Sequence, residues 1–378
     1  MSDSRAPSLV ATPHRLTLSS PDALLAAIPH LLGFPPRDSV VLVGLGADAD
    51  GRESIQLTQR FDRPSDDLSS EELVQIARTV AAPMRACGSS SVIVAVFADE
   101  QPSAPGVLPS TAFVDELVDA LDEGGLWVTD SLYTDGATRW AYGCESPSCC
   151  PTSGVPISDD LRTMVAAEFA GAGAAMASSR QALTDEVAAD PARIEEVTAH
   201  LHAHEQAASG DLEGWRDETI GQIAGLRSDP NPSAATLGAV VAGLRDTRVR
   251  DTALWELAMD PDTSGNVISG LTMAVRSAPQ GQVAPAATVL AIQHWTRGDG
   301  ARANACLNRA MVDDPGYSLA AMTGTAMSGG LPPSSWTNVM SQLDRGVCRH
   351  GSNPPAPAAT VHTSPSPPIV SVAPGLAS

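Results

Sequence analysis

Two short apolar segments constrain the fold of this chain more than any other feature. Residues 39–45 (SVVLVGL) and 91–98 (SVIVAVFA) are continuous apolar runs of strand length. A strand has this composition when both faces of its sheet are covered, because neither face then needs polar side chains. The sequence therefore predicts a sheet with a layer packed on each side.

The segments around these runs have the pattern of covering helices and further strands. Ser20 and Pro21 predict the start of a helix that Pro29 bends or ends. Ser69 and Glu72 form a capping-box pattern before a second helix. A third helix is expected over residues 114–123, and additional strands over 54–61, 126–133 and, at the sheet edge, 139–143. This order indicates a layered α/β domain over residues 16–158.

The chain changes character after Ser158. Alanine-rich helical segments follow, interrupted by Asp-Pro pairs, with no convincing strand pattern. Residues 298–315 match the turn and second helix of a tetratricopeptide repeat, so we expect an all-α, helical-repeat-like domain of degenerate tetratricopeptide type over residues 159–350. Residues 1–15 are expected to be a flexible N-terminus. Residues 351–378 lack Asp, Glu, Lys and Arg and are rich in Pro, Ser and Ala, which predicts a disordered tail.

The composition excludes several classes of protein. The chain has no lysine, which rules out Schiff-base chemistry, pyridoxal phosphate attachment, a P-loop and a protein kinase. Its net charge of −21 argues against nucleic acid or an anionic membrane as a partner. The N-terminal residues contain no apolar signal-peptide core, and no run is long enough to cross a membrane. We therefore expect a cytoplasmic protein with reduced cysteines.

The segment 137–157 concentrates cysteines beside aromatic residues. Cys144, Cys149 and Cys150 could serve a metal site, a redox site or a reduced thiol cluster in a proline-rich loop. Three thiols without a nearby histidine leave a structural metal site one ligand short, so no cofactor is predicted. Zinc or iron remains the alternative. Trp140 and Tyr142 alternate along the preceding strand and are expected to anchor the loop.

Arginines near strand ends and loops are the candidate ligand-binding groups, because a guanidinium binds a carboxylate or phosphate with two parallel hydrogen bonds. The simpler interpretation is turn chemistry, in which Arg37 and Asp38 pair with each other or cap main-chain groups. The candidates are Arg37, Asp38, Ser39, Arg139, Tyr142 and Arg180.

Four segments, in this order, resemble one family. They are LLGFPPRDSVVLVGL (31–45), RWAYGCESPSCCP (139–151), SSRQAL (178–183) and GDGARANACLNRAMVDDPGYSLA (298–320). They are similar to the actinobacterial domain-of-unknown-function family 4192 (DUF4192), over nearly everything from Leu16 to about Trp336. His30, Ala141 and Ser153 differ from the residues usual in the family, which argues against catalytic roles there. The family carries no established activity, so the resemblance implies organisation and no chemistry.

The expected function is a non-catalytic binding or adaptor protein with a protein partner, because helical repeats present a concave partner surface. One alternative is a small-ligand enzyme with its site in the α/β domain near the Cys144 loop. Another is a metal- or redox-responsive regulator that acts through Cys144, Cys149 and Cys150. Nothing in the sequence names a substrate or a reaction, so the chain is not assigned to an enzyme class.

Overall fold

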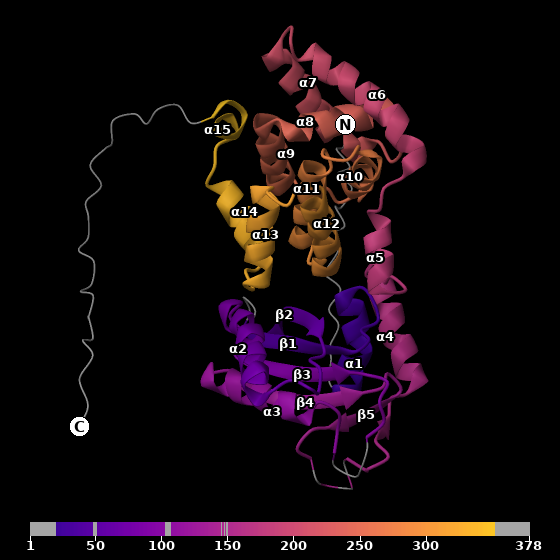
Figure 1. Ribbon diagram of the computed structural model, residues 1–378, viewed down its shortest axis with the longest axis vertical. Helices are drawn as coiled ribbons and strands as arrows, with labels where there is room; N and C mark the ends of the chain where they lie inside the picture. Colours follow the sequence, from indigo (N-terminus) through magenta and orange to yellow (C-terminus); the bar gives the residue numbers. More distant parts are fainter. Residues whose placement is uncertain are drawn as a thin grey trace, which may run out of the picture.

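The computed structural model describes residues 20–47, 51–102, 107–144, 146, 148 and 150–351. The N-terminus expected to be flexible (1–15), the tail from residue 352 and Cys149 lie outside the described residues. Figure 1 shows a part built around a sheet and a part built from helices, one above the other along the long axis of the molecule. Two helices run along one side between these parts, α4 (Asp159–Gly171) and α5 (Arg180–Glu186).

Over the described ranges, the sheet has six strands in the order β2-β1-β3-β4-β5-β6. The strands are β1 (Ser39–Ala47), β2 (Glu53–Asp62), β3 (Ser91–Phe97), β4 (Trp127–Thr134), β5 (Thr138–Ala141) and β6 (Val155–Pro156). Only β3 and β4 pair in parallel, and the other neighbours are antiparallel. The predicted edge position of β5 is wrong, because β6 pairs beyond it, and two residues are too few to give a periodic pattern.

Helices cover both faces of the sheet, as the apolar runs predicted. Helix α1 (Pro21–Leu32) packs on one face, and α2 (Ser70–Ala86) and α3 (Thr111–Glu123) pack on the other. Residues 40–43 of β1 are fully buried between these layers. The capping box is confirmed, since the Glu72 carboxylate accepts from the Ser69 N–H at 2.9 Å. Pro29 does not end α1, which continues to Leu32 because its apolar face is buried on the sheet.

A register shift in β2 places Ile55 and Leu57 on opposite faces of the sheet, although simple strand alternation would place them on the same face. Gly44 pairs with Leu57 and Leu45 pairs with Ile55, so Gln56 is an extra residue opposite β1. Leu57 consequently packs with α2 and α3, whereas Ile55 packs with α1 on the opposite face.

The second part of the described chain is helical. It contains α6 (Pro191–Ala207), α7 (Leu212–Gly225), the 3-10 helix η1 (Leu226–Ser228), α8 (Ala234–Arg245), α9 (Thr247–Met259), α10 (Asn266–Ser277), α11 (Ala284–Thr296), α12 (Gly300–Asp313), α13 (Ser318–Ser328), α14 (Ser334–Ser341) and α15 (Arg345–His350). Helix α11 is buried along residues 284–295 and forms the centre of this part. A short turn then leads into α12, which packs against α11. No helix in the described ranges is long and apolar enough to cross a membrane.

Among the contacts between the two parts within the described residues, two lie beside a cleft. Leu183 of α5 and Ala305 of α12 belong to the same apolar cluster as α1 and one face of the sheet. Gly330, after α13, lies against the main chain of Pro83 near the end of α2. A cleft lies between these two contacts.

Candidate ligand cleft between the sheet and the helices

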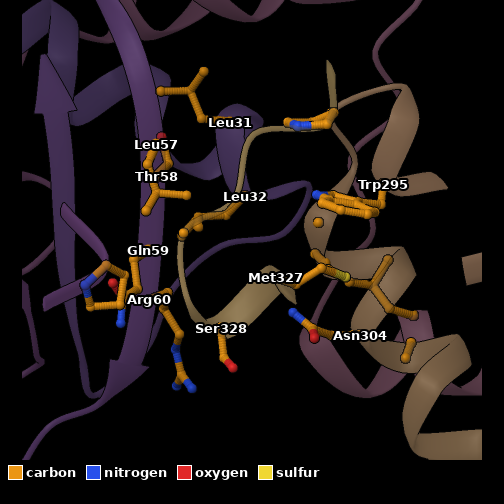
Figure 2. A pocket seen from close by; sticks show the side chains of 18 of the residues that line it. Leu31, Leu32, Leu57, Thr58, Gln59, Arg60, Trp295, Asn304, Met327 and Ser328 are labelled. Carbon is orange, nitrogen blue, oxygen red and sulfur yellow. The ribbon is translucent and has the colours of Figure 1, made fainter. Parts of the chain in front are cut away.

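The cleft has a volume of about 680 Å³. One wall is the edge strand β2, which contributes every residue from 55 to 60. The end of α1, the start of α5, and residues of α11, α12 and α13 with the following loop complete it. Figure 2 shows Thr58 and Arg60 of β2 on one side and Asn304 and Met327 on the other.

One hydrogen bond at the end of β2 shows which of its residues bond to β1 through their main-chain groups. The Arg63 N–H donates to the Asp38 carbonyl at 3.0 Å, and these residues stand directly opposite each other in the antiparallel register. In an antiparallel pair of strands, directly opposite residues alternate between pairs that exchange main-chain hydrogen bonds and pairs that do not. Gln59 therefore bonds to β1, and the N–H and C=O groups of Thr58 and Arg60 point away from β1.

Helix α12 supplies part of the opposite wall. Ala301, Asn304, Ala305 and Asn308 recur at helical spacing and line the cleft. Asn304 and Asn308 are exposed, and each amide carries both donors and acceptors. This wall therefore offers hydrogen-bonding groups to a bound molecule.

An arginine network borders the cleft at the Arg60 end of β2. Arg60 donates from Nε to Ser39 Oγ at 2.8 Å and pairs with Asp62 at 2.6 Å. Arg180 reaches the same Asp62 carboxylate at only 3.7 Å, and its side chain is 61% exposed. Arg180 thus keeps most of its hydrogen-bonding capacity for another group.

A second network fixes α5 beside the cleft. Arg302 of α12 holds both carboxylate oxygens of Glu186, at 2.7 and 3.0 Å, and also Asp299 at 3.0 Å. Burial alone would raise the pKa of Asp299, but interactions with His294 and with the main-chain N–H and guanidinium of Arg302 outweigh it and lower the pKa to about 2. Asp299 is therefore a charged link in the anchor of α5.

We expect Asp299→Asn to destabilise the protein in a pH-dependent way. The folded-state pKa lies below the unfolded value, so the contribution is present above about pH 4 and is lost as the pH falls towards about 2. The loss at neutral pH should be about 2 kcal/mol. Urea unfolding across this pH range should show that the free energies of unfolding of the wild type and the variant become equal in acid. A difference that stays constant would show that the charge of Asp299 contributes nothing.

The structure places the predicted candidates at two sides of the sheet. Ser39 and Arg180 join through Arg60 and Asp62 at the cleft. The predicted pairing of Arg37 with Asp38 is wrong. Asp38 pairs instead with Arg63 at 2.6 Å, because its positive φ of 44° turns the chain into β1 beside the end of β2. Arg63 also bonds Glu100 at 2.5 Å, whereas Arg37 is exposed.

Arg139 and Tyr142 lie away from the cleft. Arg139 is aligned across the sheet with Ser39 but on β5, three strand spacings or about 14 Å distant. Arg139 pairs with Asp22 at the start of α1, and the Tyr142 hydroxyl donates to the Pro109 carbonyl at 2.6 Å. Both side chains hold the sheet to neighbouring segments.

The cysteine loop also lies on the β5 side, with Cys144 just beyond that strand and Cys150 before β6. Its anchoring by Trp140 is confirmed, since the indole N–H donates to the Thr152 carbonyl at 3.2 Å and the ring lies under Gly154. Within the described residues, which exclude Cys149, no group of three or more potential ligands could hold a metal ion.

A smaller cavity of about 100 Å³ lies beside Cys306, next to the anchor of α5. Cys306 is fully buried, and burial raises the pKa of its thiol to about 12. A protonated buried thiol is a poor nucleophile and a poor metal ligand. We therefore assign Cys306 to packing.

Sequence reasoning missed several cleft residues. Arg60, Asn304 and Asn308 were not among the predicted site residues, and their positions in the cleft depend on how β2 and α12 face each other. The repeat-like pattern of residues 298–315 marked small residues of α12 as a close-packing face, but it did not indicate what the polar positions between them contact.

The structure defines a class of protein in which a layered, mixed α/β sheet and a helical part enclose a cleft lined by both apolar and polar side chains. The chain belongs to the family described as "Domain of unknown function (DUF4192)", whose model matches residues 21–334, and the predicted family is thereby confirmed. No curated protein and no solved structure matches the chain.

Proposed function

We propose that this protein is a non-catalytic binding protein that holds part of a protein partner in the cleft between β2 and α12. The chemistry of the lining carries the proposal. Among the cleft-lining residues in the described part of the chain, Arg60 and Arg180 are the titratable side chains, without Asp, Glu, His, Cys or Tyr. General acid–base catalysis draws on those missing groups, and a Ser or Thr nucleophile needs one of them beside it as a base, whereas amides, hydroxyls and apolar side chains suit recognition.

The position of the cleft gives independent support. Three of the four segments on which the family resemblance rests contribute lining residues, namely 31–45, 178–183 and 298–320. They are far apart in the chain and meet at this one place. The cysteine-containing segment 139–151 contributes none among its described residues.

The proposal also covers the helical architecture, the location of the protein and the class of its partner. We propose that α11 to α14 are a degenerate tetratricopeptide-like unit, supported by the packing of α11 on α12 and of α12 on α13. A cytoplasmic location and a protein partner fit the acidic chain, and its net charge of −21 disfavours nucleic acid. The alternatives, an enzyme or a metal- or redox-responsive regulator, would act through the Cys144 side of the sheet.

We expect Asn304→Trp to abolish partner binding, because Asn304 is exposed on the cleft wall and an indole would occupy the space. Val312→Trp is the matched control, since Val312 is 78% exposed on the same helix and does not line the cleft. The measurement is quantitative affinity purification from native lysate with the wild type and both variants. A partner lost with Asn304→Trp and kept with Val312→Trp supports the proposal. Equal recovery with both variants contradicts it.

A further inference from the structure

The wall of the cleft on the sheet side is a strand edge with no further strand beside it in the described part of the chain. Strand β2 is the first strand of the sheet, and β1 is its neighbour on one side only. Among the described residues, no hydrogen bond from another element reaches the outward main-chain groups of Thr58 and Arg60. An edge strand with free N–H and C=O groups is a template for pairing with another strand.

The cleft follows this edge instead of crossing it. Six consecutive residues of β2 line it, which means that it runs along the strand. A strand residue occupies about 160 Å³ of a covered sheet, from about 3.3 Å along the strand, 4.8 Å between strands and 10 Å between layers. A cleft of about 680 Å³ therefore has room for about four residues of an added strand.

The other walls suit the side chains of such a strand. The lining includes apolar groups of α1 and α13, among them Leu31 and Met327, and Met adapts its shape to different partners. It also includes Asn304 and Asn308, whose amides can bond to polar groups. Alternate side chains of an added strand point to opposite faces, so both apolar and polar side chains of such a strand would find suitable groups in the lining.

Charge indicates one feature of the occupant. In a chain with a net charge of −21, the described lining contains two arginines and no carboxylate. Arg60 is committed to Ser39 and Asp62, whereas Arg180 has one long contact and is largely exposed. An acidic side chain near the Arg60 end of β2 would find a guanidinium with free donors.

We propose, resting on the binding function above, that the cleft takes an extended peptide segment of the partner, which adds to the free edge of β2 as a seventh strand and carries an acidic residue opposite Arg180. Main-chain hydrogen bonds to Thr58 and Arg60 supply affinity that depends little on sequence. The side chains that line the cleft and Arg180 supply specificity.

The probe is a library of random peptides displayed on phage, selected against the full chain and counter-selected against Asn304→Trp. The peptides recovered should be rich in Asp or Glu beside apolar residues. Arg180→Gln should weaken their binding and reduce its dependence on salt. Arg78→Gln is the control, because Arg78 is 59% exposed on α2 and does not line the cleft.

Strand addition is tested by main-chain changes on both partners. Thr58→Pro removes an outward N–H and leaves the ladder to β1 intact, whereas Thr58→Ala removes only the side chain. We expect about a tenfold or greater loss of affinity for the proline variant and little change for the alanine variant. N-methylation along a selected peptide should weaken binding at every second residue, which tests the pairing without altering the protein.

The outcomes separate the two proposals. Peptides that depend on Asn304 but show no alternation on N-methylation and bind Thr58→Pro normally would overturn strand addition and leave cleft binding standing. Recovered peptides without acidic residues, unaffected by Arg180→Gln, would overturn the role of Arg180. Recovery of no peptide sensitive to Asn304→Trp would contradict cleft binding and strand addition together.

Discussion

Gly330→Ala should destabilise the protein by about 3 kcal/mol or more and loosen the contact between the sheet and the helices. Gly330 has a φ of 75°, and a Cβ there would lie 2.4 Å from the Pro83 carbonyl oxygen. The left-handed backbone costs a non-glycine residue about 1 to 2 kcal/mol. The collision adds to this, because the oxygen belongs to the main chain of α2 and cannot rotate away. Urea unfolding gives the stability, and hydrogen exchange at β2 reports opening of the cleft.

Gly281→Ala is the matched control for Gly330→Ala. Gly281 has a similar φ of 80°, but nothing lies within 4 Å of the position of its Cβ. This variant should lose about 1 kcal/mol and leave exchange at β2 unchanged. Equal effects of the two substitutions would show that the contact with Pro83 does not hold the two parts together.

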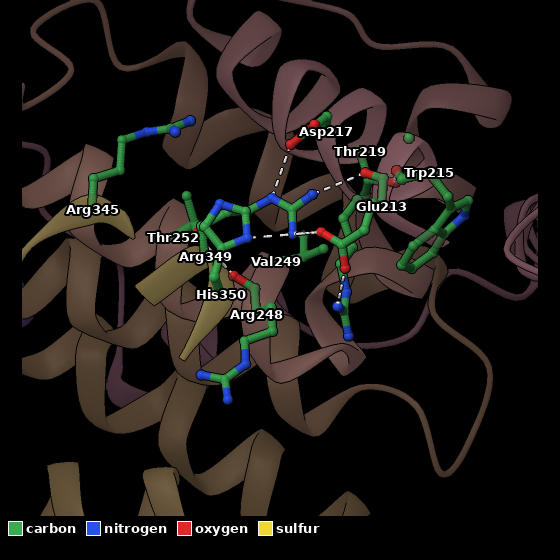
Figure 3. Close-up of polar contacts among 12 residues, drawn as sticks. Glu213, Trp215, Asp217, Thr219, Arg248, Val249, Thr252, Arg345, Arg349 and His350 are labelled. Carbon is green, nitrogen blue, oxygen red and sulfur yellow. Dashed lines mark hydrogen bonds and ion pairs between the residues drawn. The ribbon is translucent and has the colours of Figure 1, made fainter. Parts of the chain in front are cut away.

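Truncation after Leu343 should lower the melting temperature markedly, whereas truncation after His350 should leave it within error. The short helix α15 inserts Arg349, which is 2% exposed, between α7 and α9 (Figure 3). Its guanidinium donates to Asp217 at 2.8 Å, to the Glu213 carboxylate at 2.7 Å and to the Glu213 carbonyl at 2.9 Å. Losing α15 removes these contacts and uncovers the surface beneath. A Tm shift on truncation after His350 would show that the tail docks.

Arg349→Ala isolates the guanidinium from the rest of α15. We expect a loss of about 2 kcal/mol, from charge-assisted hydrogen bonds and the packing of the buried stem. Arg345→Ala is the comparison, because Arg345 is 49% exposed and its pair with Glu256 should contribute about 0.5 kcal/mol. If both substitutions have the same small effect, the buried network is not what holds α15.

Local sequence patterns predicted the elements that local physics controls. The runs at residues 39–45 and 91–98 predicted covered strands, because a strand with apolar side chains on both faces is stable when both faces are buried. The capping box at Ser69 and the change to alanine-rich helices after Ser158 are likewise read from neighbouring residues. The predicted division into domains at 16–158 and 159–350 stays a prediction, since Leu183 and Ala305 pack into the core of the sheet.

The sequence by itself therefore determined the main strands and helices of the α/β part, the covered faces of its sheet and the family, since each depends on side chains that are close in the chain. Only the tertiary structure decided that Arg180 and Arg60 both contact Asp62, that Asp38 pairs with Arg63, and that Arg139 is three strands away from Ser39. It also placed the free edge of β2 opposite Asn304. The physical reason is that such contacts depend on strand order and on how α5 and α12 dock. Those features are set by burial of apolar surface summed over the whole molecule, which no local pattern records.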